Sequence, residues 1–311
     1  MLTRLAWECR WTDRVRSAEL ARQALALVEQ QTSYDAVDRC SALRTLAWQA
    51  KWRGDFEQTT SYCLQAKQGM DRQIAKHLLV DVFSLLGVVH YSAGRRDFAS
   101  RMVRRGFDLV DDTIPDEALV DLYITQSTIQ RYRGRIEESR HALENALQLS
   151  KGAERARVEH NIARTLNYER DYVQALERAE ESLALARQFK NRIILPYTLE
   201  VLSAAQIALD RPVDALPHLE EGLEIAQADG DQRAACQLLH QLGIAQQKRG
   251  EMGHACEALT EGQRIAQAIG YPIWLTRFTE ARAQLYEAEG EFQKAASAYK
   301  EVVRLKDSMR D

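Results

Sequence analysis

The chain has 311 residues, of which 45% are hydrophobic and 28% are charged. It contains only 15 glycines and 5 prolines, too few for a turn-rich β-sandwich or an ordinary α/β enzyme of this size. The net charge of −3 provides no basic field, so we expect no nucleic-acid partner. A helical protein with a sizeable core is the simplest interpretation.

The five cysteines are scattered and odd in number, so they do not form a disulfide framework, and we expect a cytoplasmic location. The first residues lack the apolar core of a signal peptide. The longest apolar stretch, residues 193–209, is interrupted by Pro196 and Glu200 and is too short to span a bilayer. We therefore expect no membrane association.

An internal repeat begins after a degenerate first unit, residues 1–35, which turns near Thr12 and Asp13. Glycines recur at 40-residue intervals, and a longer gap accommodates two degenerate turn positions at Arg170 and Asp210. The complete set of predicted turn positions is Gly54, Gly94, Gly134, Arg170, Asp210, Gly250 and Gly290. The sequence thus predicts seven units over residues 36–306 within a single domain, 1–311.

Three columns of small residues share this register, at seven residues before each turn and at five and twelve after it. Gly, Ala, Ser or Thr fills twenty of these twenty-one positions, and Val302 is the exception. Small residues let two helix backbones approach to roughly 8–10 Å. Each unit is therefore predicted to be two helices that pack closely around a tight turn.

The small residues, the turn glycine and their order resemble the tetratricopeptide repeat (TPR). This resemblance implies an all-α fold, a right-handed α-solenoid of TPR-like helical hairpins with a period of about 40 residues. It also implies a concave side, lined by one face of each first helix, where a protein or peptide partner would bind.

Transferred to this sequence, the resemblance gathers basic and aromatic residues on the middle of the concave side. Arginine suits carboxylates and phosphates, asparagine holds peptide backbone, and aromatic rings offer rigid contact area. We expect an acidic peptide, a terminal carboxylate or a small anion there. The candidate residues are Arg131, Tyr132, Arg157, His160, Arg164, Asn167, Tyr168 and Tyr197.

Two alternatives stay open at these positions. The arginines either bind a ligand or belong to a solvated basic face, paired with Asp121 or nearby glutamates. Trp48 and Trp52, four residues apart on one predicted helix, are either a second aromatic contact for a partner or partly buried against the preceding repeat.

No catalytic motif occurs in the sequence: a phosphate loop, a dinucleotide fingerprint, a zinc-protease signature and a nucleophile elbow are all absent. Cys236 and His240 have a spacing that a metal site would tolerate, but the predicted hairpin holds Cys256 and His254 away from them. We therefore expect no catalytic residues, no metal and no cofactor in this chain.

The last helix carries Tyr299, Val302, Leu305 and Met309 in a stripe like that of a coiled coil. This tail, together with the opening Leu5-Ala6-Trp7, resembles arrays that precede bacterial diguanylate cyclase (GGDEF) domains. The resemblance implies a non-catalytic sensory region of a bacterial cytoplasmic signalling protein, with an output domain after the terminal helix or a homodimer through it. The alternative is a stand-alone adaptor or peptide receptor.

Overall fold

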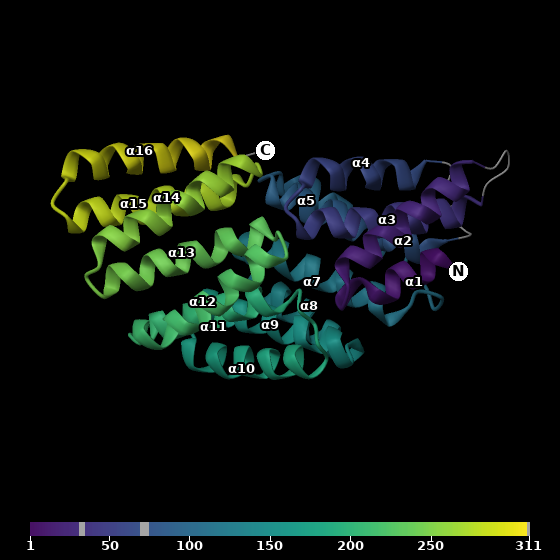
Figure 1. The fold of residues 1–311 in the computed structure, drawn as a ribbon, viewed down its shortest axis with the longest axis horizontal. Helices are drawn as coiled ribbons and strands as arrows, with labels where there is room; N and C mark the ends of the chain where they lie inside the picture. Colours follow the sequence, from purple (N-terminus) through teal and green to yellow (C-terminus); the bar gives the residue numbers. More distant parts are fainter. Residues whose placement is uncertain (31–34, 69–74, 310–311) are drawn as a thin grey trace. The chain divides into compact units, whose positions relative to one another are not determined.

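The protein is represented by a computed structural model that describes residues 1–30, 35–68 and 75–309 (Figure 1). These residues form sixteen α-helices, one 3-10 helix and no strand. Residues 31–34 of the predicted first unit and the last two residues of the chain lie outside the described residues. The all-α prediction is confirmed.

The helices follow one another along the whole described chain. In order they are α1 (Leu2–Glu8), η1 (Cys9–Trp11), α2 (Arg14–Glu29), α3 (Ala36–Trp52), α4 (Phe56–Lys67), α5 (Lys76–Ser92), α6 (Arg96–Phe107), α7 (Asp116–Tyr132), α8 (Ile136–Leu149), α9 (Gly152–Glu169), α10 (Tyr172–Gln188), α11 (Leu195–Ala208), α12 (Pro212–Ala228), α13 (Gln232–Lys248), α14 (Met252–Ala268), α15 (Pro272–Ala288) and α16 (Phe292–Ser308).

Helix length explains the 40-residue period. From α13 onward each helix has 17 residues and each connection has three, so two helices and two connections make one repeat. Side chains of Asp13, Asp55, Asp171 and Asp231 accept hydrogen bonds from backbone N–H groups in the first turn of the following helix. An acid that follows a turn therefore caps the start of the next helix at these four positions.

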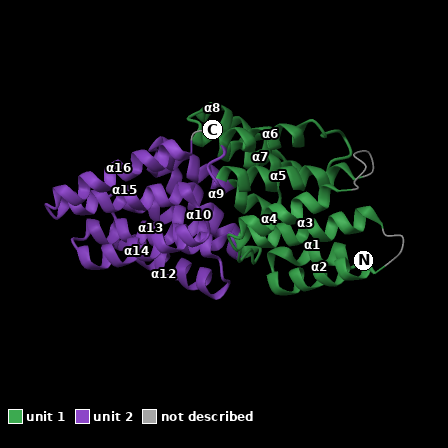
Figure 2. Ribbon diagram, turned by 90° about the horizontal axis from the view of Figure 1, so that it is seen from above, with its two compact units in different colours: residues 1–91, 96–158, 188–193 green, residues 92–95, 159–187, 194–311 purple. Residues whose placement is uncertain are grey.

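Two compact units divide the chain (Figure 2). Unit 1 contains residues 1–91, 96–158 and 188–193, and unit 2 contains residues 92–95, 159–187 and 194–311. Helix α9 carries residues of both units. The surfaces of each unit are therefore described separately below.

Every predicted turn position adopts a left-handed backbone. The five glycines have φ between 74° and 81°, and Arg170 and Asp210 have φ of 67° and 61°. The two degenerate positions were placed by spacing alone, so these angles confirm the register. An ordinary L-residue is strained in this region, whereas glycine is not.

Replacing Arg170 with glycine is expected to raise the free energy of unfolding by about 0.5–1 kcal/mol, because relief of backbone strain exceeds the entropic cost of glycine. Gly250→Ala is the reverse experiment, since an added Cβ there meets no atom within 4 Å. It should lower the free energy of unfolding by about 1 kcal/mol. Denaturant titration measures both, and equal stabilities would contradict the strain argument.

The columns of small residues form two kinds of helix contact. Within a hairpin, the residue seven positions before the turn contacts the residue five positions after it, and the Ser127 and Ser139 hydroxyls are 3.3 Å apart. Between hairpins, the residue twelve positions after the turn contacts the first helix of the following hairpin. An example is the 3.0 Å distance between the hydroxyl oxygens of Ser182 and of Thr198 on α11. Gly222 likewise packs under Leu238. The predicted close crossings are thus observed.

The terminal helix α16 does not present its predicted stripe as one exposed face. Val302 is only 5% exposed, while the large apolar residues of α16 with the highest exposed fractions are Phe292 and Val303, at 69% and 59%. The exposed apolar residues of α16 therefore differ from the stripe expected from sequence, apart from Tyr299 at 37%.

Candidate functional site

The N-terminal segment packs onto α3 in unit 1 and buries the predicted tryptophan pair. The ring of Trp48 lies 4.8 Å from Trp11 and 6.3 Å from Trp7, both edge to face, and 5.7 Å from Trp52. Trp48 is 1% exposed and Trp52 is 7% exposed. Of the two alternatives for this pair, the structure shows burial, because α1 and η1 supply two further tryptophans.

A set of buried charges lies beside these rings. Arg44 donates to the Asp81 carboxylate at 2.7 Å, and its guanidinium stacks 3.5 Å from the centre of the Trp7 ring. Arg157 pairs with Asp121 and lies 4.8 Å over Trp11, while Arg10 pairs with Glu117. Helices α3, α5, α7 and α9 thus contribute to one charged interior in unit 1. The buried-charge cluster is Arg10, Arg44, Asp81, Glu117, Asp121 and Arg157.

Burial favours a higher pKa for the carboxyl groups of Asp81 and Asp121 and a lower pKa for Arg10. It raises the pKa of the Asp81 carboxyl above its ordinary value, although Arg44 opposes this rise. For Asp121 burial acts in the same sense, but Arg157, Lys51 and Arg10 outweigh it, and the pKa is lowered. Burial lowers the pKa of Arg10 to about 9, which leaves it charged at neutral pH. The interior is therefore held by ion pairs that need each partner.

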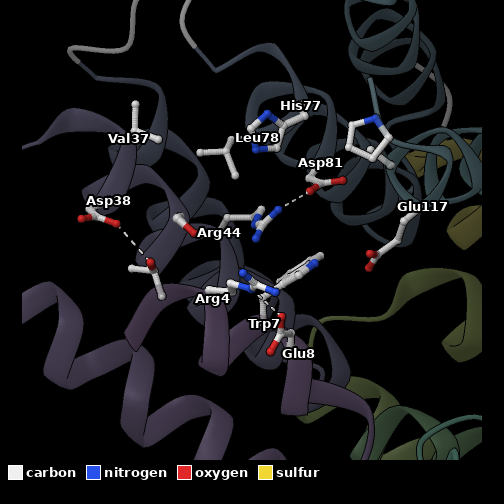
Figure 3. A pocket seen from close by; sticks show the side chains of 14 residues that line it. Arg4, Trp7, Glu8, Val37, Asp38, Arg44, His77, Leu78, Asp81 and Glu117 are labelled. Carbon is white, nitrogen blue, oxygen red and sulfur yellow. Dashed lines mark hydrogen bonds and ion pairs between the residues drawn. The ribbon is translucent and has the colours of Figure 1, made fainter. Parts of the chain in front are cut away.

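A cavity of about 410 Å³ opens at one side of the buried-charge cluster (Figure 3). Trp7, Glu8 and Arg4 lie below it in that view, and His77, Leu78 and Asp81 lie above. Asp38 on its wall accepts a hydrogen bond from the Thr3 hydroxyl at 3.0 Å. Its size suits one or two amino-acid side chains.

Two further predicted residues of unit 1 are stacked rather than open. Arg131 is 1% exposed, and its guanidinium lies 5.3 Å from the ring centre of Tyr132. Tyr132 in turn packs 4.9 Å from Tyr91. Arg157 pairs with Asp121, as the second alternative expected, but Arg131 and Arg157 are only 1% and 5% exposed and do not lie on a solvated face.

In unit 2, Arg164 connects three first helices. Its Nη2 donates to Glu200 on α11 at 2.8 Å and to Gln237 on α13 at 2.9 Å. Glu200 also accepts from Gln241 at 3.0 Å. Asn167, one turn further along α9, donates its Nδ2 to the backbone carbonyl of Val201 at 2.9 Å.

The remaining predicted residues of unit 2 differ widely in exposure. His160 and Tyr197 are each 4% exposed, with ring centres 6.4 Å apart. The Tyr197 hydroxyl donates to both carboxylate oxygens of Asp231, and burial raises its pKa well above the ordinary value. Tyr168 is 49% exposed. Within unit 2, Arg164, Asn167 and Tyr168 are therefore the predicted residues that retain accessible area, and we call them the α9 surface.

Sequence reasoning missed Trp7, Arg10 and Trp11 as contributors. Their unit was treated as a degenerate hairpin, and its first helix is broken into α1 and η1. The available signal was the Trp7 and Trp11 spacing of four, which repeats that of Trp48 and Trp52.

Neither a metal cluster nor a membrane-spanning helix is found in the described part of the chain. No group of three or more His, Cys, Asp or Glu residues within residues 1–30, 35–68 and 75–309 is arranged to hold a metal ion. No described helix is long and apolar enough to cross a bilayer.

Comparison with solved structures shows the same fold over nearly the whole chain. A Rap protein complexed with competence and sporulation factor has a TM-score of 0.70 at 14% identity, over 99% of this chain and 97% of that chain. The Rap conjugation gene regulator of plasmid pLS20, in complex with the Phr* peptide, has a TM-score of 0.68 at 11% identity, over 99% of this chain and 94% of that chain. A chain of the APC/C hetero-tetramer Cut9–Hcn1 has a TM-score of 0.65 at 12% identity, over 94% of this chain and 50% of that chain.

Comparison with curated protein sequences finds no match. Among family models, the tetratricopeptide repeat matches residues 154–228, which run from α9 to the end of α12. This match agrees with the hairpins, the turn positions and the solved structures, so the chain has the fold of a TPR-like helical-repeat solenoid, with the family model itself covering residues 154–228.

Proposed function

We propose that this chain is a non-catalytic module that binds a peptide or an extended segment of a protein on the concave side of its repeats. The carrying observation is its full-length similarity in fold to two Rap structures whose bound partners are a factor and a peptide. Identity of 11–14% supports the fold alone, so the choice of ligand depends on this chain's own side chains.

The α9 surface offers the chemistry that a peptide needs. The Oδ1 atom of Asn167 is buried and accepts no hydrogen bond from the described residues, so a peptide N–H would satisfy it. Both described hydrogen bonds of Arg164 use Nη2, which leaves Nη1 and Nε as donors to a carboxylate. Tyr168 adds an exposed ring for contact area. An acidic peptide fits this combination.

A peptide-display selection on the purified chain tests the proposal, followed by affinity measurements on variants. Asn167→Ala with Tyr168→Ala is expected to weaken selected peptides by roughly tenfold or more, because a buried acceptor and an aromatic contact are lost. Arg164→Glu should abolish binding of acidic peptides at the α9 surface, provided that circular dichroism shows a folded chain.

The matched control is Arg187→Glu, which reverses the charge of an arginine that pairs with Glu221 and is 54% exposed. Peptides should bind this variant as they bind the parent chain. Selected peptides that bind all variants equally would refute the α9 surface as the site.

The proposal extends to the kind of protein to which this module belongs. We infer a bacterial cytoplasmic signalling protein, in which the array is either a stand-alone peptide receptor or the sensory region joined to a GGDEF output domain, with a homodimer formed through α16. Sequencing the native gene past Asp311 and measuring the mass of the assembly in solution test these alternatives.

A further inference from the structure

A second surface, remote in sequence from the α9 surface, lies at the last two hairpins of unit 2. A cavity of about 820 Å³ runs between α14 and α16, with α15 as its floor. None of its lining residues belongs to α9 or α11, so it is independent of the peptide surface proposed above. We call it the outer groove.

The lining of the outer groove is strongly basic. It contains four cations, Arg282, Lys294, Lys300 and Arg304, and one carboxylate, Glu301. Arg304 pairs with Glu301 at 2.7 Å and Lys294 pairs with Glu291 at 2.5 Å, and these pairs are largely exposed. Exposed pairs of this kind are weak and exchange readily with an incoming anion.

Arg282 distinguishes this hairpin from every other repeat. The same position, eight residues before the turn, holds leucine, isoleucine or glutamine elsewhere: Leu46, Leu86, Gln126, Ile162, Leu202 and Leu242. Here the guanidinium donates to the Gln263 amide oxygen at 2.7 Å and to the Tyr286 hydroxyl at 2.6 Å. Its Nε is buried and meets no acceptor among the described residues. The two hydrogen bonds therefore orient the Arg282 guanidinium on α15, and its Nε remains as a donor without an acceptor among the described residues.

The distribution of the cations indicates the shape of the ligand. Lys294 and Arg304 are ten residues apart on α16, which is about 15 Å along a helix. An extended chain covers that length in about five residues at roughly 3.3 Å each. A single phosphate would need donors that converge on one point, whereas Lys294 and Arg304 are separated by about 15 Å along α16. We propose that the outer groove binds an extended acidic peptide segment of a partner protein, with Arg282 as its central carboxylate contact.

The test measures the anisotropy of a labelled peptide of about ten alternating Glu and Ser residues, at about 0.15 M salt to screen distant charges. Each variant below is made in a chain that also carries Asn167→Ala and Tyr168→Ala, so that the α9 surface does not contribute. Arg282→Leu installs the residue that four other repeats carry at this position, so the fold should be retained. This variant is expected to bind the peptide with roughly ten- to a hundredfold lower affinity, because a charge-assisted hydrogen bond is lost.

The chain provides a matched pair of charge reversals. Arg304 and Arg264 occupy the same position in consecutive hairpins, and each pairs with the glutamate three residues before it at 2.7 Å. Only Arg304 lines the outer groove. Arg304→Glu should weaken the acidic peptide at least about tenfold, whereas Arg264→Glu should leave its affinity unchanged.

Three results would overturn this assignment. Equal losses in Arg304→Glu and Arg264→Glu would indicate general electrostatic attraction, and full affinity in Arg282→Leu would remove the central contact. Displacement of the peptide by inorganic pyrophosphate at lower concentration than by unlabelled peptide would assign the groove to a phosphate ligand. Peptide binding that persists in the α9 variants but fails in Arg282→Leu would support the outer groove separately from the proposed function.

Discussion

Replacing Arg44 with leucine is expected to lower the free energy of unfolding by about 3–5 kcal/mol, because it leaves the Asp81 carboxylate buried without its partner. The two side chains are 7% and 6% exposed, and the distance from Arg44 Nη1 to Asp81 Oδ2 is 2.7 Å. Burial already raises the pKa of Asp81, and loss of the guanidinium raises it further. Chemical denaturation at neutral pH measures the effect.

The double variant Arg44→Leu with Asp81→Leu is the informative partner experiment. Removing both charges eliminates the desolvated carboxylate, so most of the lost stability should return. Arg4→Leu serves as the control, since Arg4 and its partner Glu8 are 83% and 53% exposed, and no measurable change is expected. If the single Arg44 variant is as stable as the Arg4 variant, the buried pair does not hold unit 1 together.

Gly243→Leu is expected to lower the free energy of unfolding by about 1–3 kcal/mol through overpacking. Gly243 lies where α13 crosses α14, and even a Cβ there would stand 2.6 Å from two side-chain carbons of Leu259. A backbone oxygen of Ala255 lies on the same side at 3.4 Å, so the neighbouring helix must move. A thermal melt of the purified chain should show the loss.

Gly253→Leu is the matched control for this substitution. Gly253 lies in the first turn of α14, and an added Cβ would meet no atom within 4 Å. Leucine has a higher helix propensity than glycine, so this variant should be as stable as the parent or more stable. Equal melting temperatures for the two leucine variants would mean that the close crossing is not at Gly243.

The repeat architecture was predictable because its determinants are local and recur along the chain. A left-handed turn residue and three small residues define each hairpin, and their spacing located Arg170 and Asp210 without any glycine. Helix crossings demand small side chains whatever the surrounding sequence is. The sequence alone therefore determined the fold, the register and the positions of the close contacts.

The partners of the charged and aromatic residues were decided only by the tertiary structure. Arg164 meets Glu200 and Gln237, which are 36 and 73 residues away, and Arg10 meets Glu117 on α7. Trp48 is buried by rings from a segment that the repeat pattern does not describe. Side-chain pairing depends on which helices approach one another and on how far burial shifts each charge, and repeat spacing carries neither quantity.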